Sequence, residues 1–294
     1  MHPDTHMGPV HLTVADLKQA LHFYSNLLGL KILQSQRGTT WLSADGSHPL
    51  LALTRLPDAK PRPHFSAGLY HFAILLPGRY DLAHALHHLL ALRYPLQGAS
   101  DHLVSEAIYL ADPEGNGIEI YADRPRSDWL WQDGQLRMTT EVLDLDLLLA
   151  ELGRGKVTWE GLPPGTRIGH VHLQVGDLES AERFYREILG FELTARYGSE
   201  ALFLAAGGYH HHVGCNTWAG KGAPPAPSDA RGLRYLTICV PNETELALVA
   251  SRLERHDWTF QQRPGLLSLR DPFNIGMLIV AGEPTLGRNG SLTW

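Results

Sequence analysis

Residues 207–218 read GGYHHHVGCNTW, and the consecutive histidines His210, His211 and His212 are the first group in the chain that could do chemistry. Imidazole is the commonest protein ligand for metals, and it also transfers protons near neutral pH. If the run is part of a strand, His210 and His212 share one face and His211 points to the other. The run therefore indicates either a metal or acid–base site or an ordinary hydrogen-bonded strand edge.

Further histidines and one carboxylate lie in apolar segments that read as strands. His11 and His172 occupy the same place in VHLTV and VHLQV, His71 lies in GLYHFAILLP, and Glu119 lies between two isoleucines. A buried histidine needs only a hydrogen-bond partner, so one such residue alone does not indicate a ligand. An ionised glutamate is costly to bury without a partner, and a metal ion would supply one.

The segments that must position these residues are repeated. GPVHLTVADLKQALHFYSNLLGL (8–30) matches GHVHLQVGDLESAERFYREILGF (169–191) at a constant offset of 161 residues. Each copy reads as a strand, an aspartate that caps a helix, a helix with apolar periodicity, and a glycine that ends it. A weaker pair, GLYHFAILLP (68–77) and GLRYLTICVP (232–241), starts two similar units. We therefore predict four related modules.

The order of these modules suggests two domains. The N-terminal domain spans residues 1–125, with modules at 8–56 and 67–125. A connector at 126–166 contains a short helix within 139–152. The C-terminal domain spans residues 167–294, with modules at 168–218 and 231–282.

Bulk composition narrows the function classes. The chain has 294 residues, 44% of them hydrophobic, so it can bury a large core. Its formal net charge of −6 argues against a nucleic-acid partner. Two cysteines do not make a disulfide framework, and no apolar run is long enough to cross a membrane. The first residues lack the pattern of a signal peptide, so we expect a cytoplasmic protein.

The repeated module start (His11 to Gly29, and again His172 to Gly190) and the hairpin DPEGNGIEIY (Asp112 to Tyr121) resemble the vicinal oxygen chelate superfamily. That superfamily includes glyoxalase I, fosfomycin-resistance proteins and extradiol dioxygenases. The chain is most similar to two-domain bacterial catechol 2,3-dioxygenase-type proteins. The resemblance implies an α+β fold in which four βαβββ modules pair into cup-shaped mixed sheets, with metal ligands on the first and last strands of the modules.

Two pairings of the modules are open. Sequential pairing of modules one and two would gather His11, His71 and Glu119, and it is the commoner arrangement in dioxygenases of this family. Crossed pairing of modules two and three would gather His71, Glu119 and His172, with the histidine run beside them. Because crossed pairing brings every candidate to one place, we expect His71, Glu119 and His172 to be the metal ligands.

The resemblance also implies a catalytic histidine beside the metal ligands. His212 best matches its position, with His210 as the alternative on the same face. Tyr109 lies ten residues before Glu119, where related dioxygenases keep a tyrosine, and His102 could hydrogen-bond the substrate or oxygen. We therefore take His212, Tyr109 and His102 as the candidate catalytic residues.

These residues favour a metal-dependent extradiol dioxygenase that opens a catechol-type aromatic diol with O₂. Two histidines and one carboxylate are typical of non-haem Fe(II) oxygenases, although Mn(II), Ni(II) or Zn(II) could bind the same donors. The alternatives are a glyoxalase-like isomerase or lyase, and a protein that sequesters a small molecule. Members of the superfamily often assemble through sheet edges, so the sequence is compatible with a homo-oligomer and leaves the oligomeric state undecided.

Overall fold

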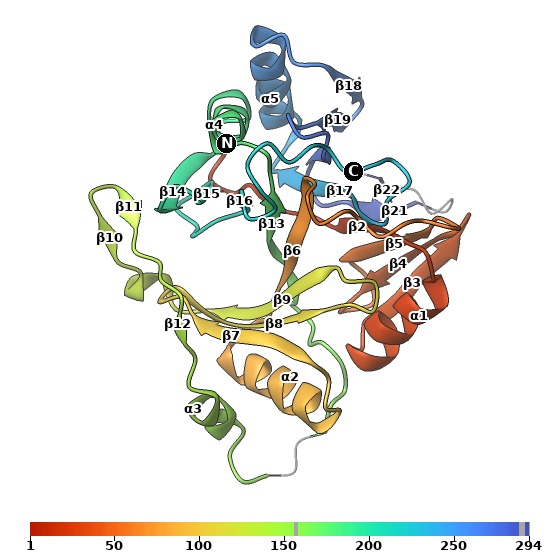
Figure 1. The fold of residues 1–294 in the computed structure, drawn as a ribbon, viewed down its shortest axis with the longest axis vertical. Coiled ribbons are helices and arrows are strands. Elements are labelled where there is room, and N and C mark those ends of the chain that lie inside the picture. Colours follow the sequence, from red (N-terminus) through yellow and green to blue (C-terminus); the bar gives the residue numbers. More distant parts are fainter. Residues whose placement is uncertain (156–157, 288–291, 294) are drawn as a thin grey trace.

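The computed structural model describes residues 1–155, 158–287 and 292–293. Two nine-stranded mixed sheets form its framework, and the helices pack around them (Figure 1). This architecture confirms the predicted α+β fold class. None of the helices in the described ranges has the length and apolar character needed to cross a bilayer.

Each module contains one strand, one helix and three further strands. The first comprises β2 (Val10–Val14), α1 (Leu17–Leu21), η1 (His22–Leu27), β3 (Lys31–Gln36), β4 (Thr39–Ser43) and β5 (Leu51–Arg55). The second comprises β6 (Gly68–Leu75), α2 (Arg79–Ala91), β7 (Leu96–Asp101), β8 (Ser105–Ala111) and β9 (Gly117–Asp123). The third comprises β13 (Arg167–Gln174), α4 (Leu178–Glu182), η4 (Arg183–Ile188), β14 (Glu192–Tyr197), β15 (Ala201–Ala205) and β16 (Val213–Asn216). The fourth comprises β17 (Gly232–Val240), α5 (Glu243–Arg255), β18 (Phe260–Arg263), β19 (Leu266–Arg270) and β20 (Gly276–Ala281).

The modules pair in the crossed arrangement. Modules two and three form the central sheet, in the order β12-β7-β8-β9-β6-β13-β16-β15-β14. Modules one and four form the terminal sheet, in the order β18-β19-β20-β17-β2-β5-β4-β3, with β1 added beside β17. The first strands of the paired modules run antiparallel at the middle of each sheet, β6 against β13 and β17 against β2. Each sheet therefore combines one module from each half of the chain.

Short elements make up the connector and the chain ends. They are β1 (His6–Met7), η2 (Arg126–Asp128), β10 (Trp131–Gln132), β11 (Gln135–Leu136), β12 (Glu141–Val142), α3 (Leu145–Leu149), η3 (Ala150–Leu152), β21 (Thr285–Leu286) and β22 (Leu292–Thr293). The helix predicted within 139–152 begins only at Leu145, because the Asp144 carboxylate accepts a hydrogen bond from the Leu147 backbone N–H and caps it there.

The helix boundaries of the repeated module follow its sequence signals. Asp16 accepts a hydrogen bond from the backbone N–H of Gln19, and Asp177 accepts one from that of Ser180, so both predicted N-caps are confirmed. Unlike the expected regular α-helix, each helix continues as a π-helical segment, η1 or η4, over its Phe-Tyr pair. Such segments contain a locally widened turn.

A buried tyrosine of each repeated helix ties one sheet to the other. The Tyr24 hydroxyl of module one donates a hydrogen bond to Asp112 of module two, with an oxygen–oxygen distance of 2.8 Å. The Tyr185 hydroxyl of module three donates an equivalent bond of 3.0 Å to Asp271 of module four. Since Asp112 opens the turn before β9, this contact also fixes the strand that carries Glu119.

Candidate metal centre

Three buried side chains from adjacent strands of the central sheet meet at one point. They are His71 on β6, Glu119 on β9 and His170 on β13. Glu119 Oε2 lies 3.0 Å from His71 Nε2 and 3.1 Å from His170 Nε2. One ligand atom from each of the three lies within 4.8 Å of the others, which is close enough for all three to bind a single ion.

Strand register explains why these residues converge. Ala73 on β6 is the partner of Glu119 on one side and of His170 on the other. His71 lies two residues before Ala73, so both side chains point to the same face. Because the alanine between the two donors is small, the row Glu119–Ala73–His170 leaves space above the sheet for His71 to approach both.

A bulge in β13 sets the position of His170. The pairing of β13 with β6 shifts register between Ile168 and His170, at Gly169. A Cβ atom at Gly169 would lie 1.7 Å from the Tyr121 hydroxyl oxygen, so only glycine fits there. The bulge therefore lets β13 pass close to Tyr121 while His170 still faces Glu119.

Electrostatics in this group favour an anionic Glu119 carboxylate beside a neutral His170 imidazole. Burial alone would raise the pKa of Glu119, but His170 and His71 outweigh it and hold that pKa well below its usual range. Burial lowers the pKa of His170 to about 4, although Glu119 opposes the shift. Neutral imidazole and ionised carboxylate are the protonation states that bind metals.

An unused nitrogen supports a metal at this point. His71 Nε2 is shielded from solvent and lies 3.0 Å from Glu119 Oε2, yet within the described residues it makes no hydrogen bond of acceptable geometry. Buried polar atoms are rarely left without a partner. A divalent cation fits this set of two imidazole nitrogens and one carboxylate. It would bind all three donors at once, including the unsatisfied His71 nitrogen.

His172 lies beside this cluster and makes a different contact. Its Nε2 accepts a hydrogen bond of 3.0 Å from the Asn216 side-chain amide. The His172 ring centroid is 5.1 Å from that of His71, so the side chain lines the same cavity. The role of His172 as a ligand stays a prediction. Of the two histidines on β13, the one whose ring nitrogen lies next to Glu119 Oε2 is His170, at 3.1 Å.

His170 escaped the sequence interpretation for an identifiable reason. At the offset of 161 residues His172 matches His11, whereas His170 matches Pro9, so the repeat drew attention to His172. Alternation along the strand was the available signal, since residues 170 and 172 of β13 must point to the same face.

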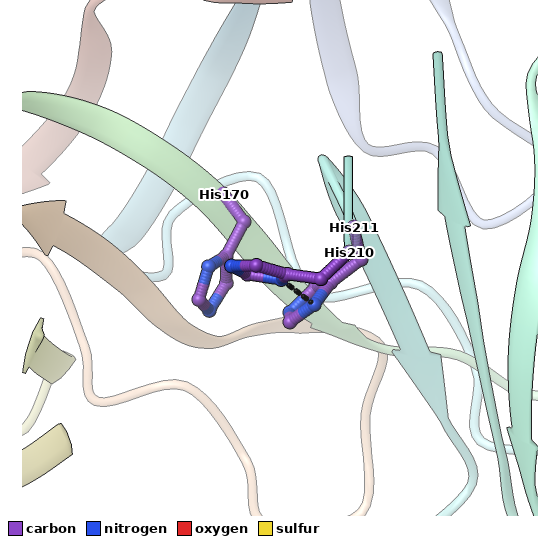
Figure 2. Close-up of side chains that lie close together, drawn as sticks. All are labelled: His170, His210 and His211. Carbon is purple, nitrogen blue, oxygen red and sulfur yellow. Dashed lines mark hydrogen bonds between the residues drawn. The ribbon is translucent and has the colours of Figure 1, made fainter. Parts of the chain in front are cut away.

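Two residues of the histidine run lie beside His170 of this centre, as Figure 2 shows. His210 and His211 lie with His170, and the three rings offer ligand atoms within 4.8 Å of one another. The rings of His170 and His211 have centroids 4.0 Å apart. His210 Nδ1 lies 2.7 Å from His211 Nδ1, and His210 Nε2 lies 3.0 Å from Asp123 Oδ1.

His212 takes a different direction from the one expected. Its Nδ1 accepts a hydrogen bond of 3.2 Å from the Ala206 backbone N–H, and its ring packs on Tyr209 with centroids 4.9 Å apart. It lines a second cavity, beside the N-terminal residues. The run precedes β16, which starts at Val213, so strand alternation does not govern its side chains. His211, not His212, therefore lines the cavity of the candidate centre.

Tyr109 and His102 line the same cavity. Tyr109 is the cross-strand partner of Glu119. His102 Nδ1 donates to the Thr139 carbonyl at 2.6 Å, so its Nε2 accepts the hydrogen bond from the Tyr109 hydroxyl, also at 2.6 Å. The structure thus brings these two predicted residues to the candidate centre as one hydrogen-bonded pair.

The cavity above the centre has a volume of about 570 Å³. Aromatic side chains form part of its wall, among them Tyr70, Phe203 and Trp218. The Trp218 ring lies 5.1 Å from that of Tyr70 and 5.4 Å from that of His172, centroid to centroid. An apolar wall with a few convergent polar groups is typical of small-molecule sites.

Known proteins share sequence and fold with this chain. The profile of the Glyoxalase/Bleomycin resistance protein/Dioxygenase superfamily matches residues 6–120 and 167–267. A Bacillus subtilis (strain 168) protein named catechol-2,3-dioxygenase is 46% identical over 275 residues, which are 92% of this chain and 95% of that protein.

Solved structures share the fold at low sequence identity. A protein from Bacillus subtilis subsp. subtilis str. 168, provisionally named a dioxygenase, aligns with a TM-score of 0.64 and 13% identity, over 95% of this chain and 86% of its own. Glyoxalase I from Zea mays aligns with a TM-score of 0.56 and 14% identity, over 95% of this chain and 93% of its own.

Proposed function

Because the chain belongs to the Glyoxalase/Bleomycin resistance protein/Dioxygenase superfamily, we propose that it is an extradiol dioxygenase that opens a catechol-type aromatic diol with O₂. The observation that carries this proposal is the convergence of two imidazoles and one carboxylate below an aromatic-walled cavity, with His211 in contact with one of them. The 46% identical relative named catechol-2,3-dioxygenase supports the same activity.

His71, His170 and Glu119 are the proposed metal ligands. We place His170 in this set instead of His172 because His170 contacts Glu119 while Asn216 binds His172. Two imidazoles and a carboxylate on one side of an ion are typical of non-haem Fe(II), and Mn(II), Ni(II) and Zn(II) remain alternatives. When bound there, the ion would hold the two diol oxygens and O₂ next to each other.

His211 is the proposed proton acceptor, and its neighbours fix its tautomer. The Asp123 carboxylate can only accept a hydrogen bond, so His210 Nε2 carries a proton and donates it. With its one proton on Nε2, His210 would accept at Nδ1 from the Nδ1–H of His211. This series of hydrogen bonds leaves the His211 Nε2 lone pair free to take a proton from a diol hydroxyl in the cavity.

The pKa of His211 differs from that of an ideal general base, whose pKa lies near the working pH. Burial, and then the neighbouring His170 and His210, instead lower the pKa of His211 well below its ordinary value. His211 is therefore neutral at pH 7, and an adjacent substrate anion would stabilise its protonated form.

Other residues orient the substrate. The Tyr109 hydroxyl donates to His102, so its oxygen can still accept a hydrogen bond from a ligand near Glu119. The rings of Tyr70, Phe203 and Trp218 offer apolar surfaces to a planar aromatic ring. These groups would hold the ring in place while His211 takes the proton.

Oxygen consumption tests the proposal. Protein purified anaerobically and loaded with Fe(II) should consume one O₂ per catechol. It should release a ring-opened product that contains both atoms of that O₂. Hydroquinone, whose hydroxyls cannot both bind one ion, is the matched control and should give no consumption. The proposal fails if protein loaded with Fe(II) or Mn(II) consumes no O₂ with any vicinal diol; oxygen-independent isomerisation of a hemithioacetal would favour the glyoxalase-like alternative.

A further inference from the structure

A second group of metal-binding side chains lies in the terminal sheet. His6 on β1 is the cross-strand partner of Cys239 on β17. Glu283 follows β20 and reaches the same place, and the ligand atoms of all three lie within 4.8 Å of one another. The three residues come from distant parts of the chain, and none of them belongs to the centre described above.

The histidine nitrogen in this group resembles His71 Nε2 of the first centre. His6 Nε2 lies 2.8 Å from Glu283 Oε1 and is shielded from solvent, but among the described residues it makes no hydrogen bond of acceptable geometry. In both groups an imidazole nitrogen therefore lies close to a carboxylate without pointing at it. A shared ion between the two side chains would satisfy this geometry.

The backbone leaves room for the cysteine sulfur. A Cβ atom at Gly8 would lie 2.7 Å from Cys239 Sγ, so the N-terminal segment can pass the sulfur only as glycine. The Gly8 backbone N–H donates to the Thr237 carbonyl at 2.9 Å and holds the segment in this position. The thiol is fully buried, whereas 39% of the His6 side chain and 66% of the Glu283 side chain are exposed. His6 and Glu283 also line a cavity, from which an ion could approach the group.

The three side chains offer donors whose charges match a divalent cation. A divalent cation bound by a thiolate, a carboxylate and a neutral imidazole would leave a group with no net charge. Zn²⁺ accepts this mixture of sulfur, nitrogen and oxygen ligands at tetrahedral sites.

We propose that His6, Cys239 and Glu283 form a second metal site, which binds Zn²⁺ or a similar divalent cation with water as the fourth ligand. The ion would fasten the N-terminal strand β1 to β17 and to the segment after β20. The site does not depend on the proposed dioxygenase activity, since it shares no residue with that centre.

Cobalt binding tests the site directly, because a Co(II)–thiolate bond has a charge-transfer absorption that histidine and carboxylate ligands lack. Metal-free protein titrated with Co(II) should develop this absorption with one equivalent bound at the thiolate. Cys239→Ser should abolish it. Cys215→Ser is the matched control, since Cys215 is the chain's other cysteine and is buried in the core, and it should retain the absorption.

Two further variants guard against misfolding of the cysteine variant. His6→Gln and Glu283→Gln change side chains that are partly exposed, so they should fold, and each should weaken Co(II) binding at the thiolate at least about tenfold. Zn²⁺ should displace the cobalt and remove the absorption. Wild-type protein that binds Co(II) without a thiolate band would overturn the proposal, as would a band that Cys215→Ser removes, or unchanged affinity in both glutamine variants.

Discussion

The central and terminal sheets have the same topology but different chemistry. In the central sheet His71 pairs with His172, and Glu119 lies opposite Ala73 and Tyr109. At the equivalent positions of the terminal sheet Tyr235 pairs with His11, and Leu278 lies opposite Thr237 and Ser268. The strands thus supply the same framework twice.

The differences lie in the side chains and in the space between them. Leu278 replaces the carboxylate and packs with Trp41, Ala52 and Leu286, so apolar contacts fill the region. His11, the one histidine at these positions, has its Nε2 2.5 Å from the Thr54 hydroxyl oxygen. The comparison indicates that a module pair gathers possible metal ligands where donors occupy adjacent strands around a small residue such as Ala73.

Removing the carboxylate from the central sheet should have the largest effect. Glu119→Ala should lose the metal and more than ~100-fold of any oxygenase activity, because one of the three proposed ligands is gone. Elemental analysis and oxygen uptake measure the two effects. Leu278→Ala, the same position in the terminal sheet, is the control and should retain both. Retention of metal by Glu119→Ala would remove the basis for the proposed centre.

Three histidine variants sharpen the ligand assignment. His170→Ala should empty the protein of metal, since His170 contacts Glu119. His172→Ala should retain the metal, because Asn216 already binds its Nε2, and His11→Ala in the terminal sheet should retain it too. Metal content of anaerobically purified protein checks all three. A protein emptied by His172→Ala and not by His170→Ala would restore the ligand set predicted from the sequence.

The histidine run offers a comparison between neighbours. His211→Ala should retain the metal and lower turnover by about 10²–10⁴-fold, as expected for loss of a general base. His212→Ala should leave turnover within a few-fold, since its ring lines the other cavity. Steady-state kinetics on metal-loaded protein distinguish them, and the opposite pattern would return the catalytic role to His212.

A smaller effect concerns acid stability in the terminal sheet. Burial lowers the pKa of His11 to about 3, whereas the unfolded chain keeps an ordinary value near 6.5. Below about pH 6.5 the unfolded state therefore binds the extra proton, and the free energy of unfolding falls until about pH 3.

In His11→Gln the unfolded chain can no longer bind this extra proton. The decrease in the free energy of unfolding between pH 7 and pH 5 should therefore shrink by about 2 kcal/mol. Urea unfolding at the two pH values measures the difference. Because His11 lies outside the proposed metal sites, metal content does not complicate the result. An unchanged pH dependence would mean that His11 is already protonated in the folded protein.

Most of the local structure could be predicted from the sequence. The strand-and-helix repeat, the caps Asp16 and Asp177 and the superfamily resemblance rest on residues close together in the chain, and all are confirmed. Short-range hydrogen bonds and apolar periodicity fix such features before distant segments meet. His71 and Glu119 were recognisable for a similar reason, since each interrupts an apolar strand.

The rest depended on contacts between distant segments. Sequence alone left both module pairings open, because either one satisfies the apolar faces of the strands. Only the antiparallel contact of β6 with β13 decided which histidines meet, and only the bulge at Gly169 brought His170 to Glu119. The direction of His211 likewise follows from Asp123, 88 positions earlier, through His210. The sequence by itself determined the modules and the kinds of donor, whereas the tertiary structure decided which donors share a site, because sheet register sets distances that no spacing along the chain encodes.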